Sequence, residues 1–525
     1  MSSMPIANNT DSVIDRLTSL EQTLDQIYLV IMGILVLLMQ CGFAFLEAGS
    51  VRSKNTSNIL IKNLFDSFLS GIAYWTVGYA FAYGPGNSFI GWHYFSSSEL
   101  TDSDLAFFFF QFVFAATAAT IVSGALAERC DFIAYLIYSF LITAFIYPVV
   151  THWAWFHEGW LAQGMVYEIN GQNVTINYHD FAGSGVVHCV GGSAAFFGAL
   201  ILGPRIGRFH KETGTTINLR GHSVPFAALG GFILVFGFMA FNGGSQLTIS
   251  KPGDGAKISL AIVNTVISGS TAAFATLLIH KIGILGKHWS LLNTLNGALA
   301  GMVAVCAGCD LIRPWGATIV GAIACVSFNF TSWLINKAKI DDPVDAVAVH
   351  FGGGSWGVIA VAFLRYDDGI LMSWDRQSGL FLAWQLVGLS AIIAWSGGLC
   401  FICFMAMRLL GILRVSEEME IKGLDIPKHN EPAYPLESYG HGYLEKIVTI
   451  LEDGQLSSLH QGYLNGGFTK DLGPYESPEV KIMGTNEVRM ILSLDQPLST
   501  RALGYIPNNN REPITFDGTA ERTAL

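Results

Sequence analysis

Apolar runs long enough to cross a membrane recur along this chain of 525 residues, and they limit the folds open to it. A helix needs about 20 mainly apolar residues to span a bilayer. Charged residues make up only 13% of the chain, about half the share in soluble globular proteins. The runs lie near 27–48, 59–83, 105–127, 131–151, 185–203, 223–241, 258–281, 289–308, 315–336, 345–364 and 380–409. They predict an all-α polytopic membrane protein with about eleven transmembrane helices.

The basic residues between the runs predict the orientation of the chain. Lysine and arginine concentrate in cytoplasmic loops of membrane proteins. One set of loops is rich in them: Arg52, Lys54, Arg129, Arg205, Arg208, Lys211, Arg220, Lys281, Lys287, Lys337 and Lys339. The other set holds fewer: Lys251, Lys257, Arg313, Arg365 and Arg376. The N-terminus is therefore expected outside and the C-terminus in the cytoplasm, and no basic stripe suggests nucleic-acid binding.

Composition divides the chain into four segments. Residues 1–26 are expected to form an extracellular N-terminal segment, and residues 27–409 the transmembrane domain. Residues 410–450 mix charges with glycine and proline, which is compatible with an ordered cytoplasmic regulatory segment. Residues 451–525 are rich in glycine, serine and asparagine, which is typical of a flexible tail.

Apolar residues before and into the first run follow a heptad spacing. They are Val13, Leu17, Leu20, Leu24, Ile27 and Ile31. Alternating steps of four and three place such residues on one face of a helix. Two interpretations stay open: an extension of the first helix that lies on its own subunit, or an extracellular contact between subunits.

The pattern V-H-x-x-G-G occurs twice, at residues 187–192 and 349–354, inside long apolar stretches. Ionisable side chains in membrane helices are costly and usually face a pathway or a partner. Corresponding positions in two halves indicate an internal inverted repeat, here five plus five helices, with a site between them. We therefore expect His188 and His350 to line a pore, although a membrane histidine can also simply hydrogen-bond between helices. Asp180 and Asp345 precede them, and Asp180 is better suited to capping a helix start than to proton transfer.

A second group of candidate site residues is aromatic. Phe114 lies in the third run, Trp155 ends the fourth, and Phe238 and Phe241 lie near the end of the sixth, which continues as Asn242-Gly-Gly-Ser245. Aromatic faces attract cations. Aromatic belts also form at membrane interfaces without binding a ligand, so composition leaves both interpretations open.

Over about residues 27–435 the chain resembles the ammonium transporter (Amt/Mep/Rh) family, and within it the Amt branch. The most specific motif is D-F-A-G-S-G-V-V-H-C-V-G-G-S-A-A-F-F-G-A-L-I-L-G-P-R at residues 180–205. Residues 42–55, 124–129 and 341–350 match family motifs as well. The resemblance implies a homotrimer in the plasma membrane, with one path for ammonium, ammonia or methylammonium through each subunit.

The resemblance also implies roles for individual residues. Phe114, Trp155 and Ser245 would form an outer vestibule that recruits ammonium, with Asp180 supporting it from behind. Phe114 and Phe241 would stack as a gate, and His188 and His350 would line an apolar pore below. An ion that loses its proton there crosses more cheaply than one that cannot, which would select ammonium over potassium and sodium.

Phe238, Asn242 and Asp345 are expected to support this site. Many relatives have tryptophan where this chain has Phe238, and plant relatives have a phosphorylatable threonine where it has Pro427. Two alternatives stay open: an Rh-like channel for neutral ammonia or carbon dioxide, and an ammonium sensor that signals through the C-terminal tail. The sequence contains no nucleophile, paired-carboxylate, metal or cofactor pattern that would indicate an enzyme.

Overall fold

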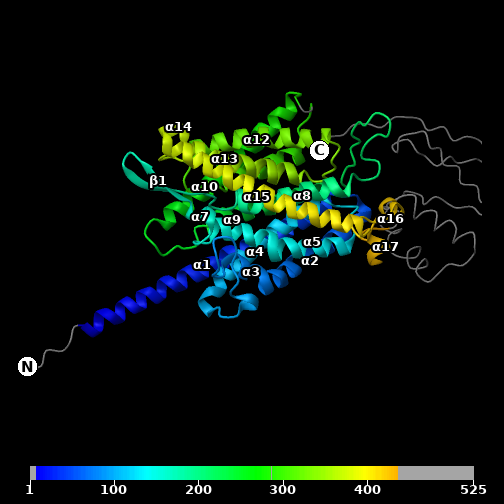
Figure 1. Ribbon diagram of the computed structural model, residues 1–525. Coiled ribbons are helices and arrows are strands. Elements are labelled where there is room, and N and C mark those ends of the chain that lie inside the picture. Colours follow the sequence, from blue (N-terminus) through cyan, green and yellow to red (C-terminus); the bar gives the residue numbers. More distant parts are fainter. Residues whose placement is uncertain (1–6, 285–286, 436–525) are drawn as a thin grey trace, which may run out of the picture. The chain divides into compact units, whose positions relative to one another are not determined.

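The computed structural model describes residues 7–284 and 287–435, and helices dominate this part of the chain (Figure 1). The longer helices are α1 Ala7–Ser50, α2 Thr56–Ala73, α4 Leu105–Ala125, α5 Phe132–Leu141, α8 Val190–Leu202, α9 Val224–Gly244, α10 Asp254–Lys281, α11 Leu291–Val305, α12 Pro314–Lys337, α13 Gly353–Leu364 and α15 Arg376–Leu409. The shorter ones are α3 Tyr79–Tyr83, α6 Tyr147–Trp155, α7 Trp160–Gln163, α14 Ile370–Ser373, α16 Glu417–Lys422 and α17 Asp425–His429. Single 3-10 turns are η1 Ser53–Asn55, η3 Phe95–Ser97 and η4 Asp102–Asp104.

Nine helical segments within residues 7–284 and 287–435 are long and apolar enough to cross a membrane. This confirms the predicted class, a helical polytopic membrane protein. The two remaining runs are helical as well: residues 56–83 pass from α2 into α3, and α11 is apolar but has 15 residues. The count of eleven and the five-plus-five inverted repeat stay predictions.

Four turns within the described helices have the wider π-helical form, which periodicity did not predict. They are η2 Tyr74–Gly78, η5 Ile142–Ile146, η6 Ser184–Cys189 and η7 Val347–Gly352. Such turns are rare and frequently lie at functional sites. The two predicted pore histidines lie in η6 and η7, and each turn leads directly into an α-helix, α8 or α13.

A small hairpin departs from the predicted all-helical fold. Strands β1 Met165–Ile169 and β2 Gln172–Ile176 pair antiparallel, with Ile169 opposite Gln172. The two residues between them, Asn170 and Gly171, both have positive φ. Asn-Gly is the preferred sequence for this type of turn, so the sequence did contain a hairpin signal.

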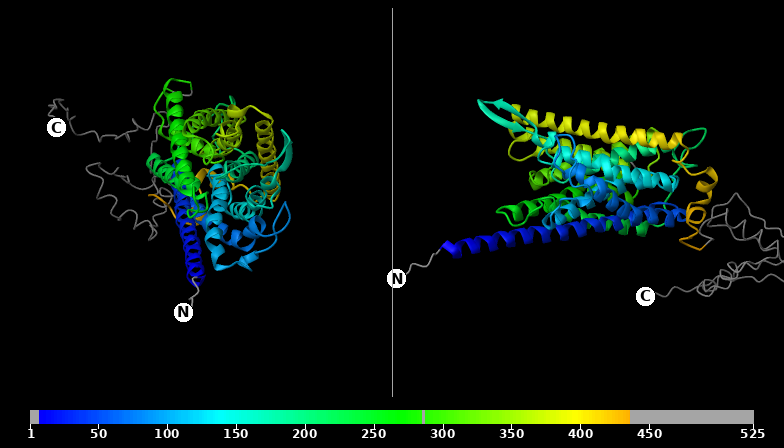
Figure 2. Two further views of the ribbon diagram at one scale, coloured as in Figure 1. Left: turned by 90° about the vertical axis from the view of Figure 1, so that its left-hand side faces the viewer. Right: turned by 60° about the horizontal axis from the view of Figure 1, so that its bottom comes forward.

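Helix α1 runs without a break through the boundary predicted at residue 26. Figures 1 and 2 show its first turns extending beyond the neighbouring helices, and Val13, Leu17 and Leu20 are more than half exposed. The interpretation that this seam lies on its own subunit is therefore wrong over these turns. Asp25, which accepts hydrogen bonds from the Ser250 hydroxyl and amide, ties the extension to the segment between α9 and α10.

Glycines let α1 and α9 pack with their backbones in contact. A Cβ on Gly230 would lie 2.1 Å from the Leu46 nitrogen, and one on Gly49 would lie 2.3 Å from the Ala227 nitrogen. Small residues at such positions are the usual way for membrane helices to approach closely. The contact fixes α1 against the wall that α9 contributes to the site described below.

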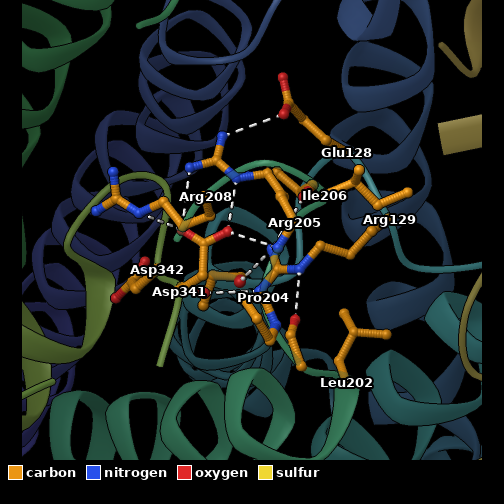
Figure 3. A network of polar contacts seen from close by, with 12 residues as sticks. Glu128, Arg129, Leu202, Pro204, Arg205, Ile206, Arg208, Asp341 and Asp342 are labelled. Carbon is orange, nitrogen blue, oxygen red and sulfur yellow. Dashed lines mark hydrogen bonds and ion pairs between the residues drawn. The ribbon is translucent and has the colours of Figure 1, made fainter. Parts of the chain in front are cut away.

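Buried ion pairs join several of the basic loops at one end of the helices (Figure 3). Arg205 Nε lies 2.7 Å from Asp341 Oδ2, and Arg205 Nη1 lies 3.1 Å from Glu128 Oε2. Arg208 binds the other oxygen of Asp341, and Arg52 binds Glu128 at 2.8 Å. We call this group, Arg52, Glu128, Arg205, Arg208 and Asp341, the charged cluster.

The two neighbouring aspartates at this end have opposite pKa shifts. Burial favours the neutral form of Asp341, but hydrogen bonds from Arg205 and the charges of Arg129 and Arg205 outweigh it. The pKa of Asp341 is therefore held well below its usual range. Burial, together with the charge of Asp345, raises the pKa of Asp342 to about 7.

The C-terminal segment packs at the same end, as α16 and α17. The Glu420 carboxylate accepts hydrogen bonds from the Ile206 amide and from Arg414. The Asp425 carboxylate accepts the amides of Thr56 and Asn58 at the start of α2. The predicted regulatory segment is thus ordered as far as the structure describes it, while the tail predicted over 451–525 lies outside the described residues.

Candidate functional site

Five aromatic rings form a continuous row through the interior. Trp155, at the end of α6, lies edge-on to Phe114 of α4, with ring centroids 6.0 Å apart. Phe114 stacks on Phe241 of α9 at 4.1 Å. The His188 ring lies 5.4 Å from that of Phe241, and the His350 ring follows at 5.2 Å. Trp155 is half-buried, whereas the other four side chains are buried, so the row leads from a partly accessible end into the core.

The two imidazoles are in direct contact. His350 Nδ1 lies 3.1 Å from His188 Nδ1, which is hydrogen-bond distance. One nitrogen must therefore donate a proton and the other accept it, so the facing atoms of the pair hold one proton between them. On the far side of the ring, His188 Nε2 lies 3.8 Å from Cys306 Sγ.

The glycines of the repeated pattern bring the two histidine segments together. A Cβ on Gly192 would lie 2.5 Å from the Phe351 nitrogen, beside His350. A Cβ on Gly354 would lie 2.4 Å from the Ser184 oxygen, in the turn that carries His188. A glycine of each copy thus leaves space for the backbone of the other histidine-bearing turn. This mutual contact explains why histidine and glycine recur at the same spacing.

Asp180 organises the entrance to η6. Its carboxylate accepts hydrogen bonds of 2.8–2.9 Å from four backbone N–H groups, those of Gly183, Ser184, Gly185 and Val186. Its carbonyl oxygen accepts the Trp155 indole N–H at 2.6 Å. Asp180 therefore links the ring at the accessible end of the row to the turn that carries His188.

In the second half, Asp342 and not Asp345 holds the comparable place. The Asp342 carboxylate accepts the Val347 amide at 2.8 Å, at the start of η7. Asp345 instead accepts a hydrogen bond from the Ser332 hydroxyl at 2.9 Å. Asp180 precedes His188 by eight residues and Asp342 precedes His350 by eight, so equal spacing was the signal that could have identified Asp342.

The remaining candidates lie on or beside α9. The Phe238 ring is 5.7 Å from that of His188, so Phe238 contributes to the wall of the row. The Ser245 hydroxyl donates to the Phe241 carbonyl oxygen at 2.8 Å, and this half-buried side chain ends the helix. Asn242 is buried and donates to Thr265 Oγ1 at 2.8 Å, which ties α9 to α10.

Comparison with known proteins decides the family. The family model described as Ammonium Transporter Family matches residues 27–434. The chain belongs to the ammonium transporter family. A Caenorhabditis elegans protein provisionally named ammonium transporter 1 is 48% identical over 524 residues, 96% of this chain and 94% of its own. Ammonium transporter 1 member 3 of Solanum lycopersicum is 38% identical and covers 79% of this chain and 94% of its own.

Solved structures agree with the ammonium transporter family. One titled Sensor Amt Protein has a TM-score of 0.71 and 33% identity, and covers 78% of this chain and 100% of its own. Mep2 of Saccharomyces cerevisiae has a TM-score of 0.66 and 24% identity, and covers 75% of this chain and 88% of its own. At that identity the second comparison supports the fold alone.

Two residues of this ammonium transporter family member were not expected at the site. The Phe43 ring of α1 lies 6.3 Å from that of His350 and prolongs the row. Glu47 follows one turn later on the same face of α1 and is 2% exposed. A carboxylate within an apolar run was the available signal. Within the described residues, no group of three or more His, Cys, Asp or Glu side chains could hold a metal ion.

Proposed function

We propose that the protein carries ammonium across the plasma membrane, recruiting the ion at Trp155 and moving it along the ring row. The observation that carries this proposal is the row itself, which leads from a half-buried indole to two imidazoles in hydrogen-bond contact. Aromatic faces suit a cation, and imidazole suits proton exchange near neutral pH.

At the outer end, the rings of Trp155 and Phe114 would replace part of the water around ammonium. Cation–π contacts contribute about 1–2 kcal/mol at partly desolvated sites. The Ser245 hydroxyl has lone pairs free to accept an N–H even while it donates to Phe241. Phe114 and Phe241 would then have to separate for the substrate to pass.

Further in, the substrate would travel as ammonia. A charge moved into an apolar interior loses several kcal/mol of hydration, and the buried rings around His188 offer no carboxylate in return. Ammonium can release a proton to an imidazole, whereas potassium and sodium have none to release. We propose that the proton follows through the protein, so that net transport moves charge and the membrane potential drives it.

The family suggests the remaining features. We propose a homotrimer in which each subunit has its own ring row, with methylammonium as a second substrate. The charged cluster and α16–α17 would face the cytoplasm, in agreement with the excess of basic residues at that end.

Expression in oocytes tests the proposal. Voltage-clamp current on addition of ammonium or methylammonium is measured alongside uptake of isotope-labelled methylammonium, with water-injected oocytes as control. A saturable current that matches uptake is expected. Uptake without current would instead indicate a channel for neutral ammonia, and neither signal in protein shown at the surface would favour a sensor.

A further inference from the structure

A small cavity lies beyond the twin histidines, on the side away from Trp155. Its lining includes His350, Phe43, Phe238, Asn296 and Glu47. Its volume of about 20 Å³ is sufficient for one water-sized molecule. The row therefore continues from an imidazole into a space that a carboxylate also borders.

Glu47 is held by neutral donors. The Ser123 hydroxyl lies 2.5 and 2.6 Å from its two oxygens, and Asn63 Nδ2 donates to Oε2 at 2.7 Å. Among the residues that the structure describes, no lysine, arginine or histidine forms an ion pair with it. An intramembrane carboxylate without a counter-ion is costly and usually serves a function.

The nearby charged groups have partners of their own. Lys62 and Asp66 of α2 are the charged residues that act on Glu47 at longer range. Lys62 Nζ donates to the Cys130 carbonyl oxygen at 3.0 Å, and Asp66 accepts from the Ser139 hydroxyl at 2.7 Å. Across the cavity the facing titratable group is His350. Glu47 thus shares a space with His350, the inner member of the histidine pair.

We propose that Glu47 accepts the proton that ammonium releases, a role that rests on the function proposed above. An N–H bond of ammonium breaks, the imidazole pair takes the proton, and ammonia keeps the electron pair. The imidazole passes a proton to a water molecule in the cavity while that water gives one to the Glu47 carboxylate. Glu47 lies three residues before the end of α1 at Ser50, so its proton leaves at the end that carries the charged cluster.

The test compares Glu47→Gln with Glu47→Asp in the full-length protein in oocytes. Glutamine keeps the size and one accepting oxygen but cannot take up a proton. We expect the ammonium current of Glu47→Gln to fall about 100-fold, the lower range for a positioned proton acceptor. Uptake of methylammonium by Glu47→Gln falls less than the current, so the charge moved per methylammonium falls as well. Glu47→Asp, which keeps a carboxylate, is expected to restore part of the current.

Asp66→Asn is the matched control, because Asp66 is a buried carboxylate on the adjacent helix outside the cavity. We expect its charge-to-uptake ratio to equal that of the wild type at equal surface level. If the charge-to-uptake ratio of Glu47→Gln equals that of the wild type, as it would if current and uptake fell equally, the role of Glu47 is overturned. The proposed function would be left intact by that result. Uptake without current in the wild type would overturn the proposed function as well, because no proton would then cross.

Discussion

At the scale of single residues, the site depends on contacts that sequence could only partly foresee. The histidine pair could be predicted because His188 and His350 repeat within the same six-residue pattern. Phe43 could not, because a sequence does not tell which face of α1 meets η7, and the one signal for Glu47 was a carboxylate within an apolar run. Asp342 was obscured by Asp345, which lies nearer to the histidine in sequence but bonds Ser332.

Replacement of Trp155 by leucine tests the outer end of the row. We expect the half-saturating ammonium concentration to rise about five- to thirtyfold, because about 1–2 kcal/mol of cation–π attraction is lost. The melting temperature in detergent should fall only slightly, since this half-buried side chain at a helix end loses one hydrogen bond, to the Asp180 carbonyl oxygen. Concentration dependence of the current measures the first effect; an unchanged value would remove Trp155 from the site.

Replacement of both His188 and His350 by leucine tests the pore. We expect ammonium transport to be lost or to lose its selectivity, because no group then takes up the proton. The assembly should survive, since leucine fills the space of an imidazole, and the Cys306 thiol, which loses His188 Nε2, still donates to the Met302 carbonyl oxygen at 3.1 Å. Current, uptake and oligomer size are measured together; wild-type uptake would contradict the assignment.

At the scale of elements, periodicity predicted the helices but not their irregularities. The apolar runs correspond to helices because burial and bilayer contact both require apolar side chains over the same length. The π turns η6 and η7 add a residue to a turn, and no apolar pattern records that change. Their close approach depends on the glycines of the repeated pattern, which predict a close helix contact without telling which segment is the partner.

Helix packing can be tested at Gly230 on α9. We expect Gly230→Ala to lower stability by about 1–3 kcal/mol, because the new methyl group collides with the backbone of α1. Gly398→Ala on α15 is the control, since nothing lies within 4 Å of a Cβ there. Thermal melting in detergent measures both variants, and equal melting temperatures would contradict the tight α1–α9 contact.

At the scale of the whole molecule, the charged cluster joins loops that are far apart in the sequence. Glu128, Arg205 and Asp341 come from three different connections between helices and meet in buried ion pairs. The excess of lysine and arginine predicted that such loops share one side of the membrane. It could not predict which acid pairs with which base, because that depends on how the helices are arranged.

Asp341→Asn tests this cluster through its pH dependence. The folded pKa of Asp341 is depressed, so its contribution is full above the unfolded pKa of about 4 and is lost as pH falls through the folded value. We expect a loss of about 3–5 kcal/mol near neutral pH, as for other broken buried pairs. The melting temperature of the variant should lie below that of the wild type by a constant amount above about pH 5. This difference should narrow below about pH 4.

Glu418→Gln serves as the control for the same experiment. Its pair with Lys422 at 2.6 Å is largely exposed, and exposed pairs contribute little. We expect no measurable change in melting at any pH. A loss as large as that of Asp341→Asn would mean that overall charge, and not the buried geometry, stabilises this end.

The stacking of Phe114 on Phe241 also bears on ion leakage from the cell. With ring centroids 4.1 Å apart, this conformation leaves no space between the rings for a hydrated ion. A water-filled conduit would let sodium and protons run down their gradients whenever ammonium was scarce. If the protein functions as proposed, a conduit closed by aromatic rings would prevent that loss, so a nitrogen-starved cell could hold many copies at its surface without discharging itself.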